Sequence, residues 1–220
     1  MIIAIDGPAG AGKSTIAKIV AGELGFLYID TGAMYRALTL KAIEEKVDAQ
    51  DAAGLIELAR HSAIDLKNDA GGSLEIFLDG RDVSALIRQP RITKLVSDIA
   101  KIKGVREVML GLQRKLGKLR DSVLDGRDIG TVVFPDADRK FYIDAHPEER
   151  TRRRHKELKE LGQEINPEEV AKDIKNRDTI DSTREFAPLK KADDAIYIDT
   201  TNMTIEEVVK EVLSRIRQNG

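Results

Sequence analysis

A glycine-rich segment near the start of the chain has the residue types that hold a polyphosphate. Residues 7–14 read Gly-Pro-Ala-Gly-Ala-Gly-Lys-Ser and match the phosphate-binding pattern G-x-x-x-x-G-K-[ST]. The glycines let the backbone curl, so that successive N–H groups can face phosphate oxygens. Lys13 adds a cation near the β- and γ-phosphates, and the Ser14 hydroxyl can bind Mg²⁺. The residues predicted to hold the nucleotide are Gly7, Pro8, Ala9, Gly10, Ala11, Gly12, Lys13, Ser14 and Thr15.

The surroundings of this segment favour a phosphate-binding loop over an ordinary glycine-rich turn. An apolar run at residues 2–6 predicts a buried strand, and the pattern at 13–24 predicts a helix that stops near Gly25. The start of this helix would present its positive end to the same anion. Strand, loop and helix together predict a site for nucleotide phosphates.

Arginines recur where a second anionic substrate could be held. Arginine suits this role because its planar group pairs with two phosphate oxygens and keeps its charge. Phosphoryl transfer depends mostly on positioning and charge stabilisation, so a chain without a reactive cysteine can perform it. The alternative is that many arginines only solvate the surface. The candidates are Arg36, Arg127, Arg150, Arg152, Arg153, Arg154, Arg177 and Arg184.

The elements that must position these side chains form an alternating pattern. Helical segments separate short apolar runs that end in an acidic residue, which predicts an α/β fold with a five-stranded, parallel, doubly wound sheet flanked by helices. The site of such a sheet lies beyond the carboxyl ends of its strands, so the glycine-rich loop and several arginines should share one rim. The predicted strands span residues 2–6, 26–30, 122–125, 140–144 and 195–199.

The remaining pattern predicts helices and one insertion. Turn signals at 68–72 and 79–80 between apolar segments predict a small antiparallel insertion at about 62–84, between the second and third parallel strands. The last helix is expected to begin with a capping box formed by Thr204 and Glu207. The predicted helices span residues 13–24, 35–45, 92–102, 105–119, 148–161, 167–179 and 205–216.

Composition and charge restrict the function classes. The chain has 36 Lys and Arg against 38 Asp and Glu, so its net charge of −2 offers no overall basic field to nucleic acid. The lack of cysteine excludes a disulfide scaffold and a thiolate metal site, and the 3 histidines lack the spacing of metal ligands. No apolar run approaches the roughly 20 residues that span a bilayer, and the chain starts with a strand rather than a signal peptide. We expect a cytoplasmic protein that binds neither membrane nor nucleic acid.

Further segments give the chain a family resemblance. Residues 30–36 read Asp-Thr-Gly-Ala-Met-Tyr-Arg, and residues 125–135 read Asp-Gly-Arg-Asp-Ile-Gly-Thr-Val-Val-Phe-Pro. Arg177-Asp178 is followed by Ala-Pro-Leu at 187–189. With the glycine-rich loop, these segments closely resemble the bacterial cytidylate kinases over essentially the whole chain. The segment at 125–135 is the most specific, because a general P-loop kinase has no reason to carry it.

The resemblance implies a reaction and roles for individual residues. The implied reaction converts MgATP and CMP or dCMP into ADP and CDP or dCDP, in pyrimidine metabolism, and a monomer is the family-based expectation. Lys13, Arg127, Arg150, Arg154 and Arg184 are the expected catalytic residues. The expected acceptor contacts are Thr31, Ser97, Arg106 and Asp128 for cytosine, Arg36, Arg127 and Arg184 for the phosphate, Arg177 and Asp181 for the ribose, and Tyr35. The family often has serine at position 31, and Thr31 keeps the hydroxyl.

The chemistry of cytosine supports part of this assignment independently. Its exocyclic amine is a donor, whereas N3 and O2 are acceptors, so a carboxylate and an arginine complement its edge. Asp128 and Arg106 supply that pair. Uracil would place an oxygen against the carboxylate and leave buried groups unpaired. The alternative for Asp128 is a salt bridge with its neighbour Arg127.

The basic segment at 148–162 is interpreted as a mobile lid that closes over ATP and excludes water. Arg150 and Arg154 are four residues apart on one helix face, so we favour them over Arg152 for contacting phosphate. The chain as a whole is interpreted as a single P-loop kinase domain, 1–220. Its parts are a core of residues 1–36, 85–147 and 163–220, acceptor-side helices with the inserted hairpin at 37–84, and the lid at 148–162.

Other functions remain as alternatives. A related P-loop kinase could act on UMP, AMP, shikimate or a coenzyme precursor, but Asp128 and Arg106 favour a pyrimidine acceptor. A nucleotide switch or a nucleic-acid-associated NTPase lacks support, because the chain has no N-K-x-D motif and only 4% aromatic residues. The triplet Asp-Thr-Gly at 30–32 also occurs in aspartic proteases, but those are all-β proteins, and here the triplet follows a strand of an α/β chain.

Overall fold

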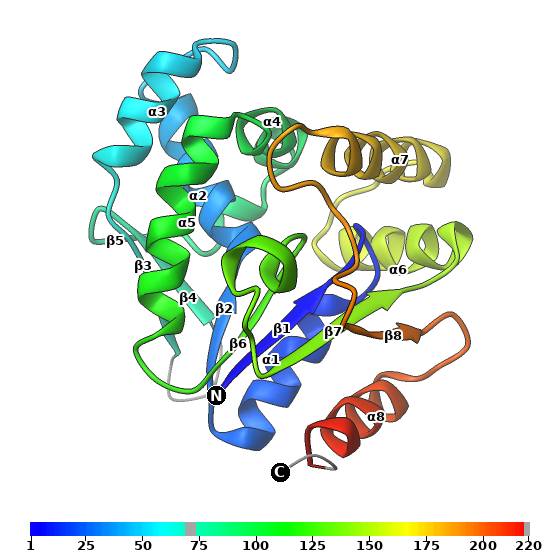
Figure 1. The fold of residues 1–220 in the computed structure, drawn as a ribbon. Coiled ribbons are helices and arrows are strands. Elements are labelled where there is room, and N and C mark those ends of the chain that lie inside the picture. Colours follow the sequence, from blue (N-terminus) through cyan, green and yellow to red (C-terminus); the bar gives the residue numbers. More distant parts are fainter. Residues whose placement is uncertain (69–73, 218–220) are drawn as a thin grey trace.

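A parallel sheet forms the centre of the computed structural model, which describes residues 1–68 and 74–217 (Figure 1). The sheet has five strands in the order β2-β6-β1-β7-β8, so β1, which precedes the glycine-rich loop, is central. All five strands predicted from the sequence are confirmed, with ends that differ by at most one residue. The strands are β1 (Ile2–Asp6), β2 (Leu27–Asp30), β6 (Ser122–Gly126), β7 (Arg139–Asp144) and β8 (Ile196–Asp199).

The helices agree with the predicted segments to within two residues, except at three places. Helix α7 ends at Thr183, four residues later than predicted. Helix α2 begins four residues earlier than predicted, because the Asp30 carboxylate accepts the N–H of Ala33 at 2.8 Å and caps the helix. Helix α3 lies in a segment for which no helix range was predicted. The capping box of α8 is confirmed, since Thr204 and Glu207 exchange backbone-to-side-chain bonds of 2.8 and 3.2 Å. The helices are α1 (Lys13–Leu24), α2 (Thr31–Glu44), α3 (Ala52–Arg60), α4 (Pro90–Ala100), α5 (Lys103–Gly117), α6 (Pro147–Glu160), α7 (Pro167–Thr183) and α8 (Ile205–Arg217).

The predicted antiparallel insertion is present as a three-stranded sheet in the order β3-β4-β5. Its strands are β3 (Ile64–Asn68), β4 (Leu74–Leu78) and β5 (Arg81–Asp82). Asp79 and Gly80 form the second predicted turn with φ angles of 50° and 81°. The first predicted turn, at 68–72, lies outside the described residues apart from Asn68.

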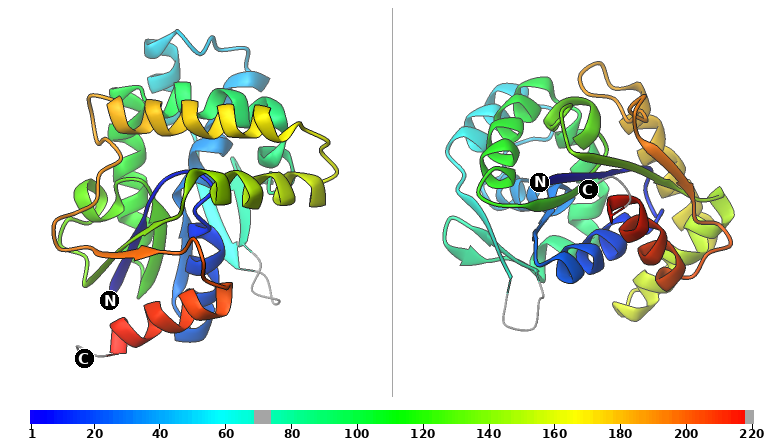
Figure 2. Two further views of the ribbon diagram at one scale, coloured as in Figure 1. Left: turned by 90° about the vertical axis from the view of Figure 1, so that its right-hand side faces the viewer. Right: turned by 60° about the horizontal axis from the view of Figure 1, so that its bottom comes forward.

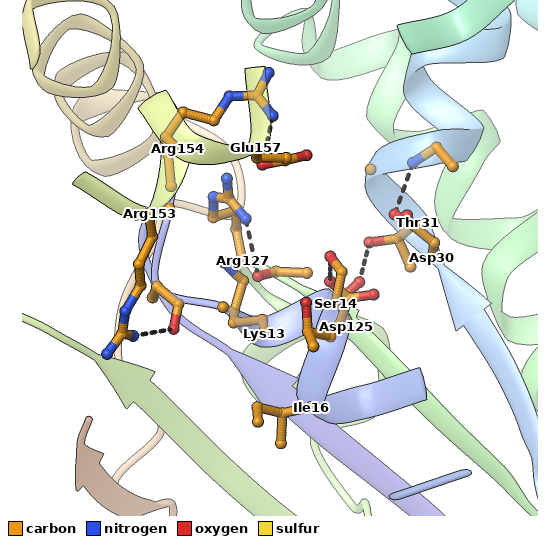
Figure 3. Close-up of a pocket in the computed structure, with 18 of the residues that line it drawn as sticks. Lys13, Ser14, Ile16, Asp30, Thr31, Asp125, Arg127, Arg153, Arg154 and Glu157 are labelled. Atoms are coloured by element: carbon orange, nitrogen blue, oxygen red, sulfur yellow. Dashed lines mark hydrogen bonds and ion pairs between the residues drawn. The ribbon is translucent and has the colours of Figure 1, made fainter. Parts of the chain in front are cut away.

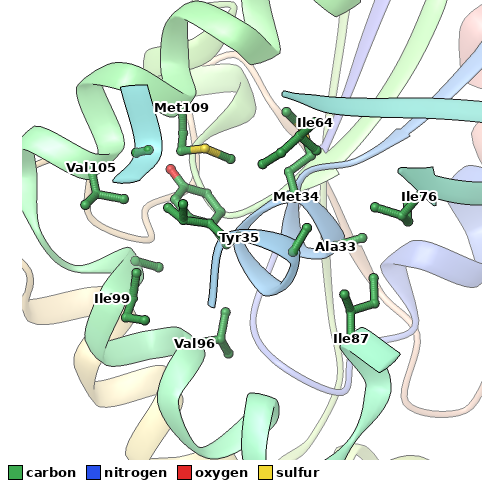
Figure 4. Close-up of a cluster of buried hydrophobic side chains, with 14 of the residues drawn as sticks. Ala33, Met34, Tyr35, Ile64, Ile76, Ile87, Val96, Ile99, Val105 and Met109 are labelled. Atoms are coloured by element: carbon green, nitrogen blue, oxygen red, sulfur yellow. The ribbon is translucent and has the colours of Figure 1, made fainter. Parts of the chain in front are cut away.

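Helices cover both faces of the parallel sheet (Figures 1 and 2), and an apolar cluster packs against each face. Ile3 and Ile5 of β1 face a cluster with α1 and α8, whereas Ala4 between them faces the cluster formed with α2 to α5. In the second cluster, Met34 and Tyr35 of α2 are surrounded by apolar side chains of α4, α5 and the small sheet (Figure 4). Helix α2 is therefore embedded in the core, which positions Tyr35 and Arg36 at the rim of the sheet.

Candidate active site

The glycine-rich loop adopts a backbone conformation that only glycine tolerates at its first position. Gly7 has a φ of 149°, and a Cβ there would lie 2.0 Å from the carbonyl oxygen of Ile143 in β7. Lys13 is buried, and its Nζ donates to the carbonyl of Pro8 at 2.6 Å. Burial, with the nearby Arg127, lowers the pKa of Lys13 to about 7. A phosphate beside Nζ would favour its charged form.

A buried carboxylate faces the hydroxyl of the loop serine. The Ser14 Oγ donates to Asp125 at 2.7 Å (Figure 3). The phenol of Tyr28 donates to the other oxygen of Asp125 at 2.9 Å. Burial, and then the charge of Asp30, raise the pKa of Asp125 to about 7. Serine and carboxylate oxygens are the hard ligands that Mg²⁺ takes, so this pair fits a metal bound together with nucleotide phosphates. Asp125 was missed as a site residue, although its place at the end of the third parallel strand was a usable signal.

Several arginines of the cavity lining are close enough for their charges to repel one another. Burial, Arg177 and Arg154 lower the pKa of Arg36 to about 9. Burial and Arg127 lower the pKa of Arg177, whose buried Nε has no hydrogen-bond acceptor among the described residues. Mutual repulsion and an unused donor indicate a site for an anion.

The far end of the cavity is built from buried ion pairs. Arg106 donates to Asp128 at 2.6 Å, and Arg184 contacts the other Asp128 oxygen at 3.4 Å. The guanidinium of Arg106 also lies 5.3 Å from the centre of the Tyr35 ring. Arg127 pairs with Asp181 at 2.9 Å and not with Asp128, so the alternative of a salt bridge between Arg127 and Asp128 is wrong.

A second buried aspartate joins the two ends of the site. Asp6, at the end of β1, accepts the backbone N–H groups of Ile129 and Gly130 at 2.8 and 2.7 Å. These groups belong to the turn that follows Asp128. Burial raises the pKa of Asp6 to about 6, while the two N–H bonds lower it. Asp6 was missed at the level of the sequence, because nothing local to the strand reveals a partner more than 120 residues away.

One cavity of about 890 Å³ connects these parts. Its lining contains both ends of the predicted site and the group of arginines, so the fold brings together residues that the sequence separates widely. Among the predicted residues, its lining includes Ala9, Gly10, Ala11, Gly12, Lys13, Ser14, Thr15, Thr31, Tyr35, Arg36, Ser97, Arg106, Arg127, Asp128, Arg154, Arg177, Asp181 and Arg184.

Arg150 lies outside this lining and instead binds the backbone of the glycine-rich loop. It donates to the carbonyls of Ala9 and Ala145 at 2.9 and 3.1 Å and pairs with Asp178 of α7. Asp178 in turn accepts the N–H of Ala9 at 3.0 Å. Arg150 therefore connects the start of α6, the glycine-rich loop and α7.

The other arginines of α6 differ in their exposure to the cavity. Arg154 faces it and pairs with Glu157 at 2.8 Å (Figure 3). Arg153 also lines it and is held by Glu149 at 2.8 Å and by Thr200 at 2.9 Å. Arg152 is largely exposed and pairs with Glu149 at 2.7 Å. Arg154 therefore lines the cavity, whereas Arg150 does not.

Comparison with known proteins identifies the family. The family model described as "Cytidylate kinase" matches residues 3–218. The chain belongs to the cytidylate kinase family. A cytidylate kinase of Clostridioides difficile (strain 630) is 54% identical over 216 residues, which is 98% of each chain. A cytidylate kinase of Caldanaerobacter subterraneus subsp. tengcongensis is 52% identical over 217 residues, 99% of this chain and 95% of the relative.

A solved structure shares the fold at low sequence similarity. An uncharacterized protein from Eubacterium ventriosum ATCC 27560 aligns with a TM-score of 0.52 at 14% identity, over 98% of both chains.

Within residues 1–68 and 74–217, no helix is long and apolar enough to cross a membrane. The same residues contain no group of three or more His, Cys, Asp or Glu side chains that could hold a metal ion.

Proposed function

We propose that this chain transfers the γ-phosphoryl group of ATP to CMP or dCMP, giving ADP and CDP or dCDP. The observation that carries the proposal is a single cavity with the glycine-rich loop at one end and the buried pair of Asp128 and Arg106 at the other. ATP fits the first end and a pyrimidine nucleotide the second, so their phosphates would meet among the arginines. We further propose, from the family resemblance, that the protein acts as a monomer.

The donor end supplies positive charge to the transferred group. The amides of the loop and Lys13 would hold the β- and γ-phosphates, and this charge becomes more effective where water is excluded. Ser14 and Asp125 would hold Mg²⁺, which when bound neutralises phosphate charge and orients the γ-phosphoryl group. Neither Ser14 nor Asp125 acts as a covalent nucleophile, since the attacking group is an oxygen of the acceptor phosphate.

The arginines bring two anions together. We propose that Arg36, Arg127 and Arg184 bind the acceptor phosphate and that Arg177 and Asp181 hold the ribose. Burial and then repulsion between arginines lower the pKa values of Arg36 and Arg177, and a bound phosphate would relieve the repulsion. Binding would thus convert unfavourable charge in the free protein into stabilisation of the complex.

The acceptor base is selected by complementary hydrogen bonds. Asp128 would accept from the cytosine amine, while Arg106 would donate to N3 or O2. Thr31 and Ser97 also line the cavity, and we propose that their hydroxyl groups contact the same base. Uracil presents a carbonyl to Asp128, which leaves two acceptors facing each other at a buried position.

Helix α6 would serve as a lid on the donor side. Arg154 would turn from Glu157 to the transferred phosphoryl group when ATP is bound, and the helix would exclude water that otherwise hydrolyses ATP. Both substrates are free nucleotides of the cytoplasm, which is where we propose that the protein acts.

An ATP-consumption assay with each acceptor in turn tests the proposal. We expect high turnover with CMP and dCMP, low turnover with UMP, and negligible turnover with AMP, GMP or shikimate. Equal turnover with CMP and AMP would contradict the proposed base selection.

A further inference from the structure

We propose that Tyr28 is a positioning residue, whose hydroxyl holds the carboxylate of Asp125 in the orientation that Ser14 and a nucleotide-bound Mg²⁺ require. This inference rests on the proposed function, because it concerns the metal that accompanies ATP. Tyr28 lies on β2, outside the glycine-rich motif and outside the acceptor contacts, so neither part of the site already described accounts for its hydroxyl.

The first argument is the way Asp125 is held. One carboxylate oxygen accepts from Ser14 at 2.7 Å and the other from Tyr28 at 2.9 Å. The ion pairs among residues 1–68 and 74–217 do not include Asp125, and the nearby Lys13 makes its hydrogen bond with Pro8. The carboxylate torsion of aspartate is broad when nothing restrains it. The orientation of Asp125 therefore depends on the two hydroxyl groups.

The second argument is the difference between those hydroxyl groups. Ser14 is exposed to the cavity, and its oxygen would also bind the metal, so its geometry changes with the ligand. Tyr28 is buried in the apolar cluster between the sheet and α1, and packing fixes its ring. A phenol is protonated at neutral pH and remains a donor. Of the two hydrogen bonds to Asp125, the one from Tyr28 is thus the one that we expect to keep its geometry when nucleotide binds.

A substitution can separate this role from simple core packing. Tyr28→Phe keeps the ring and removes only the hydroxyl. The matched control is Tyr142→Phe. Tyr142 lies on another strand of the same sheet (β7), outside the cavity lining, and its hydroxyl makes no hydrogen bond among the described residues. A packing role would change thermal stability in either variant without changing the dependence on metal.

The experiment measures binding of ATP by titration calorimetry, with excess Mg²⁺ and with EDTA, and requires no acceptor. For Tyr28→Phe we expect the dissociation constant for ATP in EDTA to be unchanged. Adding Mg²⁺ tightens ATP binding by some factor, the Mg²⁺ gain, and we expect this factor to be about tenfold smaller in Tyr28→Phe than in the unsubstituted protein. Such a loss is the size expected for one hydrogen bond to a charged group. The Mg²⁺ concentration for half-maximal turnover should rise by a similar factor. Tyr142→Phe should match the unsubstituted protein in both measurements.

A double-mutant cycle with Asp125→Asn identifies the route of the effect. If Tyr28 acts through Asp125, Tyr28→Phe has no further effect on the Mg²⁺ gain in the Asp125→Asn background. An unchanged Mg²⁺ gain in Tyr28→Phe, an equal loss with and without metal, or full additivity with Asp125→Asn would overturn the proposal. If Asp125→Asn fails to fold, the comparison of Tyr28→Phe with Tyr142→Phe decides alone. Failure of the proposed function would show separately, as absence of CMP turnover by the unsubstituted protein.

Discussion

The two ends of the cavity are built in different ways. The donor end is built mainly on one continuous segment, the glycine-rich loop, of which residues 9–15 line the cavity and whose backbone groups do much of the proposed binding. The acceptor end is assembled from side chains of separate elements, with Tyr35 on α2, Ser97 on α4, Arg106 on α5 and Asp128 after β6. Arg106 and Asp128 form a buried ion pair there, to which we attribute the proposed selectivity for cytosine. A local backbone site can be recognised from a short motif, whereas a site made of distant side chains requires the whole fold.

The largest expected effect concerns the donor end. Lys13→Ala should lower turnover by about a thousandfold or more, because it removes a cation from the transition state of phosphoryl transfer. Initial rates with saturating ATP and CMP measure this effect, with the exposed Lys115→Ala as a matched control. Turnover near that of the unsubstituted protein would mean that the loop does not perform catalysis.

The second effect should be confined to the acceptor end. Asp128→Ala should lower kcat/KM for CMP by about a hundredfold or more, because Arg106 and Arg184 lose their buried partner and the cytosine amine loses its acceptor. ATP binding should stay within about twofold, as one expects of independent sites. The exposed Asp136→Ala is the control, and a retained preference for CMP over UMP in Asp128→Ala would contradict the assigned role.

The third prediction concerns Asp6, which joins the two ends. Its pKa in the folded protein is raised to about 6 from 3.8, so between these values the folded state binds more protons than the unfolded state. Stability therefore falls as the pH rises from about 4 to about 6, by roughly 2–3 kcal/mol from this group. Asp6→Asn should lack this part of the pH dependence.

Urea unfolding of the ligand-free protein at several pH values measures the difference between the Asp6→Asn variant and the unsubstituted protein. The exposed Asp138, which accepts the N–H of Ile2 at 2.6 Å, provides the control substitution Asp138→Asn. Parallel curves for the unsubstituted protein and Asp6→Asn across pH 4–6 would contradict the assignment of the raised pKa to Asp6.

The smallest expected effect is a gain of stability at the expense of binding. Burial and neighbouring arginines make the charge of Arg36 unfavourable in the free protein. Arg36→Met should therefore raise the free energy of unfolding by about 1 kcal/mol and raise the KM for CMP. Thermal unfolding and initial rates test both parts, and a loss of stability would show that the contact of Arg36 with Thr93 at 2.8 Å outweighs the repulsion.

The same comparison shows what a sequence can predict. The parallel strands were predicted to within one residue, because short apolar runs ending in aspartate leave few alternatives. The glycine-rich loop was predicted from its own residues. The start of α2 was predicted four residues too late. Asp30 both ends the strand pattern of β2 and caps α2, so the pattern of the strand hides the start of the helix.

The residues that the sequence did not indicate act through partners that only the fold supplies. Asp125 and Tyr28 come together because β2 and β6 are neighbours, and Asp6 reaches Ile129 because β1 is central. Arg150 was expected to face phosphate on the strength of helix periodicity. Periodicity places residues on one face but does not say what that face meets, and here Arg150 meets the carbonyls of Ala9 and Ala145.

The central claim is that CMP binds in the same cavity as ATP, with its base at Asp128 and its phosphate among the arginines. A crystal structure of the protein with CMP bound tests it most directly. We expect the cytosine amine within hydrogen-bond distance of Asp128 and the phosphate in contact with Arg36, Arg127 and Arg184. A structure in which these guanidinium groups point away from the shared cavity, or in which CMP binds elsewhere, would contradict the claim.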